Sequence, residues 1–242
     1  MLTYLVTFVI IKLEKLSVDN YEKIRMSTNM KKPKKESITD QVYEIIKAQI
    51  LDQTYGFGSK LNINSLANEL NVSNTPIREA IYKLEKDGLT MFNPNSGPKV
   101  VDMNESRFNE IVETTFVLLV GGYNLCLLKN KIPKLIDLME KNLQQQKEIL
   151  VSGSEPEYAK ASVSFEECIL LALDNSQLNL IYDSLFDLLY LAVLYDHQNS
   201  KIDRNASIRD HEDILYAVKQ NSKDEVVALL RRHYSRNIRF SK

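Results

Sequence analysis

The chain has 242 residues, of which 44% are hydrophobic and 26% charged, and its formal net charge at pH 7 is −1. This composition is typical of a globular protein and excludes a disordered or fibrous one, and the length allows two domains. A nearly neutral chain has no long-range attraction for nucleic acid, so any DNA affinity must come from a local patch. Cys126 and Cys168 lie in apolar helical patterns, which favours buried reduced thiols over a disulfide.

Residues 1–36 are predicted to be an N-terminal extension that ends in a flexible arm. Residues 2–13 are mostly apolar, but the stretch is shorter than the ~20 residues of a membrane helix and lacks the features of a secretory signal. Residues 30–36 (MKKPKKE) are basic, which favours an arm that attracts phosphates; an idle solvated tail is the alternative. We therefore expect a cytoplasmic protein without a membrane partner.

Residues 37–103 are predicted to form a winged helix-turn-helix, in which three helices precede a β-hairpin. Asn71 suits the left-handed position that ends a helix, and Thr75 is expected to cap the third helix with Pro76 at its first position. Strands at 89–92 and 99–101 flank a segment dense in turn residues. The apolar residues recur at helical spacing in three places, namely residues 42–50, 66–70 and 77–84.

The first residues of the third helix are of the types that read DNA. A helix-turn-helix places the start of its second helix in the major groove. Arg78 suits a bidentate pair with guanine, and Asn74 suits the same kind of pair with adenine. Ser73 and Thr75 suit phosphate oxygens, which fix the register of the protein on the duplex. The segment therefore predicts sequence-specific binding to double-stranded DNA.

Residues 104–242 are predicted to form an all-α helical bundle. No charged residue lies between Glu113 and Lys129, so we expect the first of its helices to be enclosed by the others. The fold class is thus mainly α, a winged helix-turn-helix followed by a bundle. The bundle's six helical patterns span roughly residues 105–129, 133–151, 156–173, 176–197, 205–220 and 223–238.

Three polar residues on apolar helical stripes of this bundle make a candidate metal site. His211 and His233 lie on the apolar stripes of the last two helices, and Glu166 lies on the inner edge of an earlier one. Two imidazoles and one carboxylate suit a divalent metal such as Zn, Ni or Mn and leave positions open for another ligand. The alternative is a core in which buried histidines and a paired glutamate hold no metal.

The N-terminal motifs resemble the DNA-binding domain of GntR-family regulators. The stretch LNINSLANELNVSNTPIREAIYKLEKDGLTMFNPNSGPKV carries V-S-x-T-P-I-R-E-A, L-E-K-D-G-L and the P-N-x-G wing in order. The length and helical count of the remainder resemble the FCD branch, so the resemblance covers about residues 38–238. It implies a transcription regulator, expected to be a repressor and a homodimer, that binds a DNA operator and a small organic acid and is not an enzyme.

Carried over by position, the resemblance implies several site residues. The family has arginine where this chain has Asn74, and some members have arginine at the position of Asn64, so we expect a shifted base preference. Its D-x-x-F-H motif reads here from Ser162 to Glu166, with serine and glutamate in place of the aspartate and histidine. The implied DNA contacts are Asn64, Ser73, Asn74, Thr75, Arg78, Ser96 and Gly97; the implied metal ligands are Glu166, His211 and His233; and the effector residues are Asn175, with a helix cap as its alternative, and Arg209.

Two other functions fit the same sequence. A winged helix that contacts protein or RNA without operator specificity is the first, because Asn64 and Asn74 replace arginines. A metal-dependent hydrolase at Glu166, His211 and His233 is the second, although no general base, H-E-x-x-H, phosphate loop or nucleophile elbow accompanies the three residues.

Overall fold

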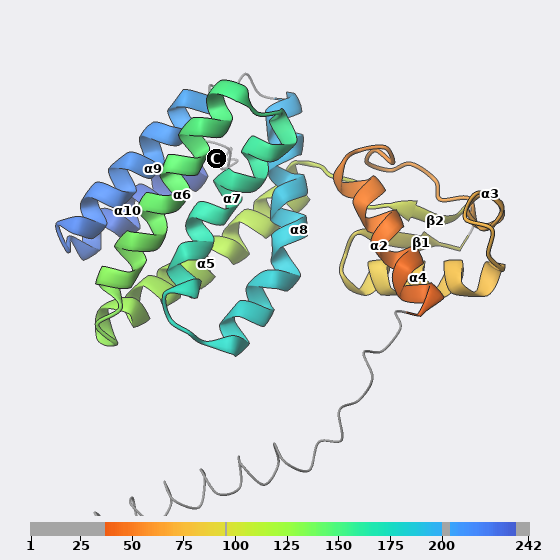
Figure 1. Cartoon of the computed structure of the whole chain (residues 1–242), viewed down its shortest axis with the longest axis horizontal. Helices are drawn as coiled ribbons and strands as arrows, with labels where there is room; N and C mark the ends of the chain where they lie inside the picture. The colour runs from red at the N-terminus through yellow and green to blue at the C-terminus, as the bar shows by residue number, and fades with distance from the viewer. Residues whose placement is uncertain (1–36, 95, 200–203, 236–242) are drawn as a thin grey trace, which may run out of the picture. The chain divides into compact units, whose positions relative to one another are not determined.

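A computed structural model describes residues 37–94, 96–199 and 204–235, and most of them lie in helices (Figure 1). The predicted extension and its basic segment, residues 1–36, lie outside the described residues. The described part consists of a small unit of three helices and a hairpin, followed by a helical bundle. The mainly α fold class is confirmed.

The small unit is a winged helix-turn-helix whose elements follow the predicted order. Ile46, Ile77 and Leu84 are fully buried in its core. Asn71 has a φ of 52° directly after the second helix, as its position predicted, and Gly97 has a φ of 79° where the second strand begins. The antiparallel strands pair Thr90 with Val100. The elements are α2 (Ile38–Leu51), α3 (Ile63–Glu69), α4 (Asn74–Lys86), β1 (Thr90–Asn93) and β2 (Gly97–Val100).

Helix α4 begins earlier than predicted. Its first helical residue is Asn74 and its N-cap is Ser73, whose side chain makes no capping hydrogen bond. Pro76 is therefore the third helical residue instead of the first. This position tolerates proline because the first four N–H groups of a helix have no acceptor within the helix. The predicted capping role of Thr75 was wrong, and its exposed side chain lies in the first turn of α4.

The bundle contains six helices in the described residues, close to the predicted ranges. Helix α7 packs against α5, α6 and α8, while α9 packs against α6 and α10 (Figure 1). Helix α10 also packs against α5, so α5 and α6 lie between α7 and the pair of α9 and α10 in this network of contacts. The helices are α5 (Glu105–Leu128), α6 (Ile132–Ser152), α7 (Glu155–Leu171), α8 (Ser176–Asn199), α9 (Arg204–Lys219) and α10 (Lys223–Ser235).

Helix α5 is not enclosed, contrary to the prediction from its lack of charge. Both α5 and α8 are long and apolar enough to cross a membrane by composition, yet only 39% and 33% of their most apolar windows are buried. Val117 and Leu128 on α5 are 70% and 79% exposed. The two helices pack against each other and against α7, as core helices of a bundle do. The chain thus exposes apolar surface on α5.

Helices α5 and α7 approach each other closely at a glycine. A Cβ atom on the buried Gly122 would lie 2.6 Å from Leu170 Cδ2 and 3.1 Å from Ile169 Cγ2. Nearby, the Cys126 thiol donates a hydrogen bond to the Ile169 carbonyl oxygen at 3.2 Å. The distance between these two helices therefore depends on the missing side chain at position 122.

Candidate functional site

The start of α4 presents all of its predicted DNA-reading residues to solvent. Ser73, Asn74, Thr75 and Arg78 are exposed, while Ile77 on the same helix is fully buried. The helix is held on its inner side by this apolar stripe, so its first turn is free to meet a partner. The side chains that carry the proposed base and phosphate contacts lie together on one face.

Asn64 and Asn74 form a pair that sequence reasoning missed. The Asn74 amide Nδ2 donates to Asn64 Oδ1 at 3.0 Å, which joins α3 to the first turn of α4. Both residues are exposed, and this bond uses neither the Asn64 amide NH2 group nor the Asn74 side-chain oxygen. A donor beside an acceptor matches the edge that adenine shows in the major groove, where N7 accepts and N6 donates.

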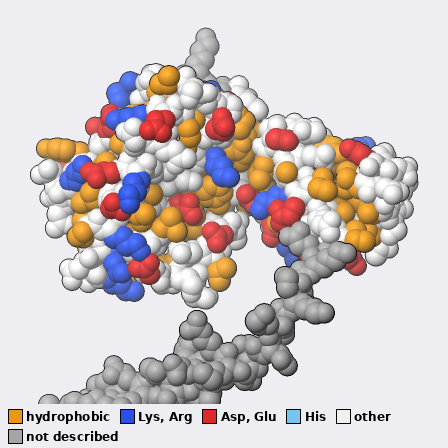
Figure 2. Space-filling view, in the orientation of Figure 1, with side chains coloured by type: hydrophobic (Ala, Val, Ile, Leu, Met, Phe, Trp, Pro, Cys, Tyr) orange, Lys and Arg blue, Asp and Glu red, His pale blue; other side chains and the backbone are white. Residues whose placement is uncertain are grey.

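The wing also matches its predicted location. Ser96 is exposed, its backbone N–H donates to the Asn93 carbonyl oxygen at 3.2 Å, and Gly97 follows it at the start of β2. A Cβ atom at Gly97 would meet no atom within 4 Å, so its backbone is accessible. On the visible face of the helical bundle, basic and acidic side chains are mixed (Figure 2).

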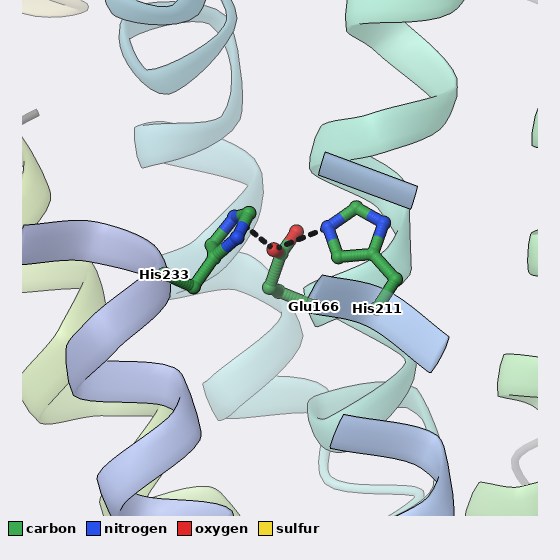
Figure 3. A group of neighbouring side chains, drawn as sticks. All are labelled: Glu166, His211 and His233. Atoms are coloured by element: carbon green, nitrogen blue, oxygen red, sulfur yellow. Dashed lines mark ion pairs between the residues drawn. The ribbon is translucent and has the colours of Figure 1, made fainter. Parts of the chain in front are cut away.

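The three predicted metal ligands come together inside the bundle. Glu166 on α7 lies between His211 on α9 and His233 on α10, and the three ligand atoms lie within 4.8 Å of one another (Figure 3). Glu166 Oε1 is 3.2 Å from His211 Nε2 and 3.1 Å from His233 Nε2. Glu166 and His211 are buried, and the His233 side chain is 17% exposed. The same ring nitrogen of each histidine thus points to one carboxylate.

The opposite ring nitrogen of each histidine contacts a polar side chain that sequence reasoning missed. His211 Nδ1 lies 2.9 Å from Gln146 Oε1 on α6, and His233 Nδ1 lies 3.4 Å from Asp210 Oδ2 on α9. Phe165 stacks on the His211 ring with centroids 4.2 Å apart. Histidines that bind metals normally donate their other N–H group to such a partner, which orients the ring.

The electrostatics of the cluster keep Glu166 ionised beside a neutral His211 and a protonated His233. Burial alone would raise the pKa of Glu166, but the neighbouring His211 and His233 outweigh burial and lower that pKa to about 2. Burial lowers the pKa of His211. Burial also disfavours the charged form of His233, but hydrogen bonds to Asp210 and Glu166 outweigh it and raise its pKa to about 9. Metals bind ionised carboxylates and neutral imidazoles, so Glu166 and His211 are in the binding form, whereas a metal would have to displace a proton from His233.

Three further positions singled out in the sequence lie outside the group of Glu166, His211 and His233. Ser162 is buried one turn before Glu166, and its hydroxyl lies 3.4 Å from that of Ser207. The Asn175 side-chain oxygen accepts hydrogen bonds from the first backbone N–H groups of α8, so Asn175 is a helix cap as its alternative predicted. Arg209 is exposed and lies two positions before His211, about 200° around the helix axis, so it points away from the cluster.

Comparisons with known proteins identify both parts of the chain. The model of bacterial regulatory proteins of the gntR family matches residues 38–100, and the FCD domain model matches residues 127–236. The chain belongs to the GntR family. It is a transcriptional regulator of the FCD branch, so the family identified from the N-terminal motifs is confirmed.

Relatives of this GntR-family regulator span most of its length. The uncharacterized HTH-type transcriptional regulator YdhC of Bacillus subtilis is 24% identical over 200 residues, covering 81% of this chain and 87% of YdhC. The gluconate operon transcriptional repressor of Bacillus subtilis is 24% identical over 198 residues, covering 79% of each chain. A solved structure of a putative GntR regulator from Rhodococcus sp. RHA1 has a TM-score of 0.64 at 17% identity, covering 84% of this chain and 99% of that one, which shows a common fold.

Proposed function

We propose that this regulator is a homodimeric repressor that binds a DNA operator and releases or holds it in response to a small organic acid bound at a metal centre. The DNA-reading part comprises residues 37–103 and the sensing part residues 104–242. The observation that carries the proposal is the exposed first turn of α4 on a packed apolar core. The protein would act in the cytoplasm, where its two cysteines stay reduced.

Operator reading is supported by the chemistry of the α4 face, which is formed by Ser73, Asn74, Thr75 and Arg78. Arg78 supplies the positively charged fork that pairs with guanine O6 and N7, and each such pair contributes about 1–3 kcal/mol of discrimination. Ser73 and Thr75 supply hydroxyl groups for phosphates, and Ser96 with Gly97 supplies a wing that approaches the backbone. The paired amides of Asn64 and Asn74 take the place of arginines, so we infer that they read adenine.

The cluster in the bundle fits a divalent metal. Glu166, His211 and His233 would hold it, and Zn, Ni and Mn all accept such a donor set. His211 Nε2 is buried without a hydrogen-bond partner among the described residues, although it faces the Glu166 carboxylate. A lone pair that faces an anion is satisfied by a cation between them, so the fit rests on this nitrogen as well as on the donor types.

The three-residue ligand set supports an anionic effector. A bound divalent metal would supply open coordination positions to a carboxylate. Because Ser162 stands where the family has a fourth, acidic ligand, this chain presents fewer protein ligands than the family pattern. The names of curated relatives include repressors of gluconate and D-xylose operons, which supports a small metabolite and negative regulation. Effector and operator affinities would be coupled by about 1–3 kcal/mol.

The exposed apolar surface of α5 supports a homodimer. Val117 and Leu128 on α5 are among the most exposed large apolar residues described, and Leu180 and Ile181 on α8 are 61% and 50% exposed. Permanent dimer interfaces are rich in apolar side chains of this kind. A two-fold protein also matches the two half-sites of a palindromic operator.

Selection of bound sequences from a genomic DNA library, followed by footprinting, tests this function. A discrete palindromic footprint is expected, and its strength is expected to change when a divalent metal and an organic acid are added together. Binding that is equally strong on all sequences and disappears at moderate salt would contradict operator recognition, because a purely electrostatic contact carries no sequence information.

A winged-helix interaction module is the second candidate. The observation that favours it is the pair of uncharged residues, Asn64 on α3 and Asn74 on α4, at positions where the family has arginine. On this alternative the same experiment would yield no footprint even at low salt, and the purified protein would retain a protein or RNA partner.

A further inference from the structure

A chain of buried amide side chains connects His211 to the backbone of α7. The Asn142 amide Nδ2 donates to the Ala161 carbonyl oxygen at 3.2 Å, and Gln146 Nε2 donates to Asn142 Oδ1 at 2.6 Å. Gln146 Oε1 then lies 2.9 Å from His211 Nδ1. Gln146 and His211 are 0% exposed and Asn142 is 8% exposed, so water does not substitute for these bonds. These four groups are called the amide chain below.

The amide chain has only one direction in which every bond is satisfied. A backbone carbonyl can only accept, so Asn142 must turn its NH2 group to Ala161 and its oxygen to Gln146. Gln146 must then donate to Asn142, which leaves its own oxygen for His211. An oxygen that only accepts requires a hydrogen on His211 Nδ1. Rotating either amide by 180° would place two oxygens against each other in a buried site. Both acceptors would then lack a hydrogen-bond donor, which destabilises the fold.

We propose that Asn142 and Gln146 are positioning residues that hold neutral His211 in the Nδ1–H tautomer, so that its Nε2 lone pair faces Glu166. This role rests on the proposed metal centre, because the lone pair is held for a metal. A neutral imidazole carries one N–H, so a hydrogen on Nδ1 leaves Nε2 as an acceptor. This agrees with the geometry of His211 Nε2, which has no hydrogen-bond partner in the described part of the chain and lies 3.2 Å from Glu166 Oε1.

Without the amide chain, the other tautomer would be preferred. A hydrogen on His211 Nε2 would donate to the Glu166 carboxylate, and hydrogen bonds to ionised acceptors are stronger than bonds to neutral amides. The same hydrogen would occupy the lone pair that a metal needs. The function of Asn142 and Gln146 is therefore to prevent an internal His211–Glu166 hydrogen bond and to keep both groups available for a cation.

Nitrogen-15 NMR of the histidine rings tests the tautomer directly. The full-length, metal-free protein is labelled at its three histidines, and the His211 signals are assigned by comparison with the His211→Gln variant. At neutral pH, His211 is expected to show a protonated Nδ1 and a bare Nε2. Gln146→Leu is expected to move the hydrogen to Nε2, and Asn142→Leu, which frees the Gln146 amide to rotate, is expected to give a mixture of both tautomers.

Gln145→Leu is the matched control, because the neighbouring Gln145 is exposed on the same helix. It is expected to leave the His211 signals unchanged. A hydrogen on Nε2 of His211 in the wild-type protein, alone or together with one on Nδ1, would overturn the proposal. So would a Gln146→Leu variant that is folded by circular dichroism and keeps the wild-type tautomer.

Titration with Ni²⁺ or Zn²⁺ separates this proposal from the metal centre itself. Gln146→Leu is expected to weaken metal binding about 10- to 100-fold, as the loss of an outer partner of a ligating histidine does, while Gln145→Leu is expected to leave it unchanged. Equal affinities for Gln146→Leu and wild type would overturn the positioning role. A wild-type protein that shows the Nδ1–H tautomer but binds neither metal would support the amide chain and count against the metal centre.

Discussion

The two sites of this regulator differ in how their side chains relate to the folded core. On the winged helix-turn-helix, Ser73, Asn74, Thr75 and Arg78 are exposed and the core beneath them is apolar. In the bundle, Glu166 and His211 are themselves buried and depend on polar partners from other helices. Substitutions at the first site therefore need not change the stability of the fold, whereas the side chains of the second site are part of the core.

This difference has a consequence for mutation. Exposed substitutions away from caps and packed contacts usually change stability by less than about 0.5 kcal/mol. Removing one member of a buried charged pair costs about 3–5 kcal/mol, because it leaves the partner unpaired. Changes at the α4 face should therefore alter binding alone, and changes in the bundle should alter binding and stability together.

Arg78→Ala is expected to have the largest effect on function and almost none on stability. The loss of one bidentate guanine pair lowers discrimination by roughly 5- to 150-fold per half-site, and a dimer loses two. Footprinting should show no specific protection, while the melting temperature and the metal content stay unchanged. Arg231→Ala, an exposed arginine on α10, is the matched control. Undiminished operator affinity in Arg78→Ala would contradict the assignment of this face.

Replacing both His211 and His233 is expected to abolish metal binding and the effector response while leaving effector-free operator binding intact. The double alanine variant leaves Glu166 buried without a partner, so its free energy of unfolding should fall by several kcal/mol. The double glutamine variant retains hydrogen-bonding groups and separates metal loss from unfolding. Elemental analysis measures the metal, and His197→Ala is the control. Wild-type protein without a stoichiometric divalent ion would refute the ligand assignment.

Ser162→Asp is expected to lower the melting temperature of the metal-free protein and to raise its affinity for metal. The new carboxylate lies one turn before Glu166 and restores the acidic residue of the family motif. Without a metal it adds a buried negative charge, which lowers the melting temperature; with a metal it adds a ligand, which raises affinity. Calorimetric titration and thermal melting test both signs. A variant that lowers both quantities would place position 162 outside the ligand sphere.

Asn74→Arg is expected to change which base is preferred without changing the fold. The substitution breaks the hydrogen bond to Asn64 and introduces a guanidinium fork that fits guanine. The preferred base at one operator position should therefore change from adenine to guanine, with a discrimination of about 1–3 kcal/mol. Asn68→Arg, at an exposed position on α3, adds the same charge elsewhere and controls for general phosphate attraction. Identical base preferences in Asn74→Arg and wild type would show that the amide pair does not read bases.

The smallest expected effect is a change in the rate of thiol alkylation, which depends on the opening of the bundle alone. The chain's two cysteines lie on α5 and α7, and burial raises the pKa of the Cys126 thiol to about 11 and that of Cys168 to about 12. At neutral pH both stay protonated and react only when the bundle opens. A divalent metal should slow labelling, whereas Arg78→Ala should leave the rate unchanged. Rapid labelling of the native protein would contradict the buried assignment.

The sequence predicted most of what is local. The left-handed turn at Asn71, the order of the winged-helix elements and the helices of the bundle depend on residue types a few positions apart, which a pattern reveals. Glu166, His211 and His233 were found because each breaks an apolar stripe. The outer partners Gln146 and Asp210 were not found, because polar residues within a helix give no sign of which distant side chain they meet.

Two misjudgements have the same physical origin. The uncharged stretch of α5 predicted enclosure within one protomer, but a lack of charge does not distinguish burial inside a chain from an apolar face exposed on it. The predicted start of α4 relied on the preference of proline for the first position, whereas the unpaired N–H groups of the whole first turn tolerate it. Both depend on the neighbours of a segment rather than on its own residues.

The glycine at the α5–α7 contact has a mechanical consequence. Gly122 brings the backbone of α5 against the side chains of Ile169 and Leu170, which follow Glu166 by one turn on α7. Because Gly122 has no side chain that could yield at this contact, we expect a displacement of α7 by a ligand at Glu166 to move α5 as well. Since α5 carries the exposed apolar surface with Val117, this helix would connect a ligand bound in the interior to the outer surface of the bundle.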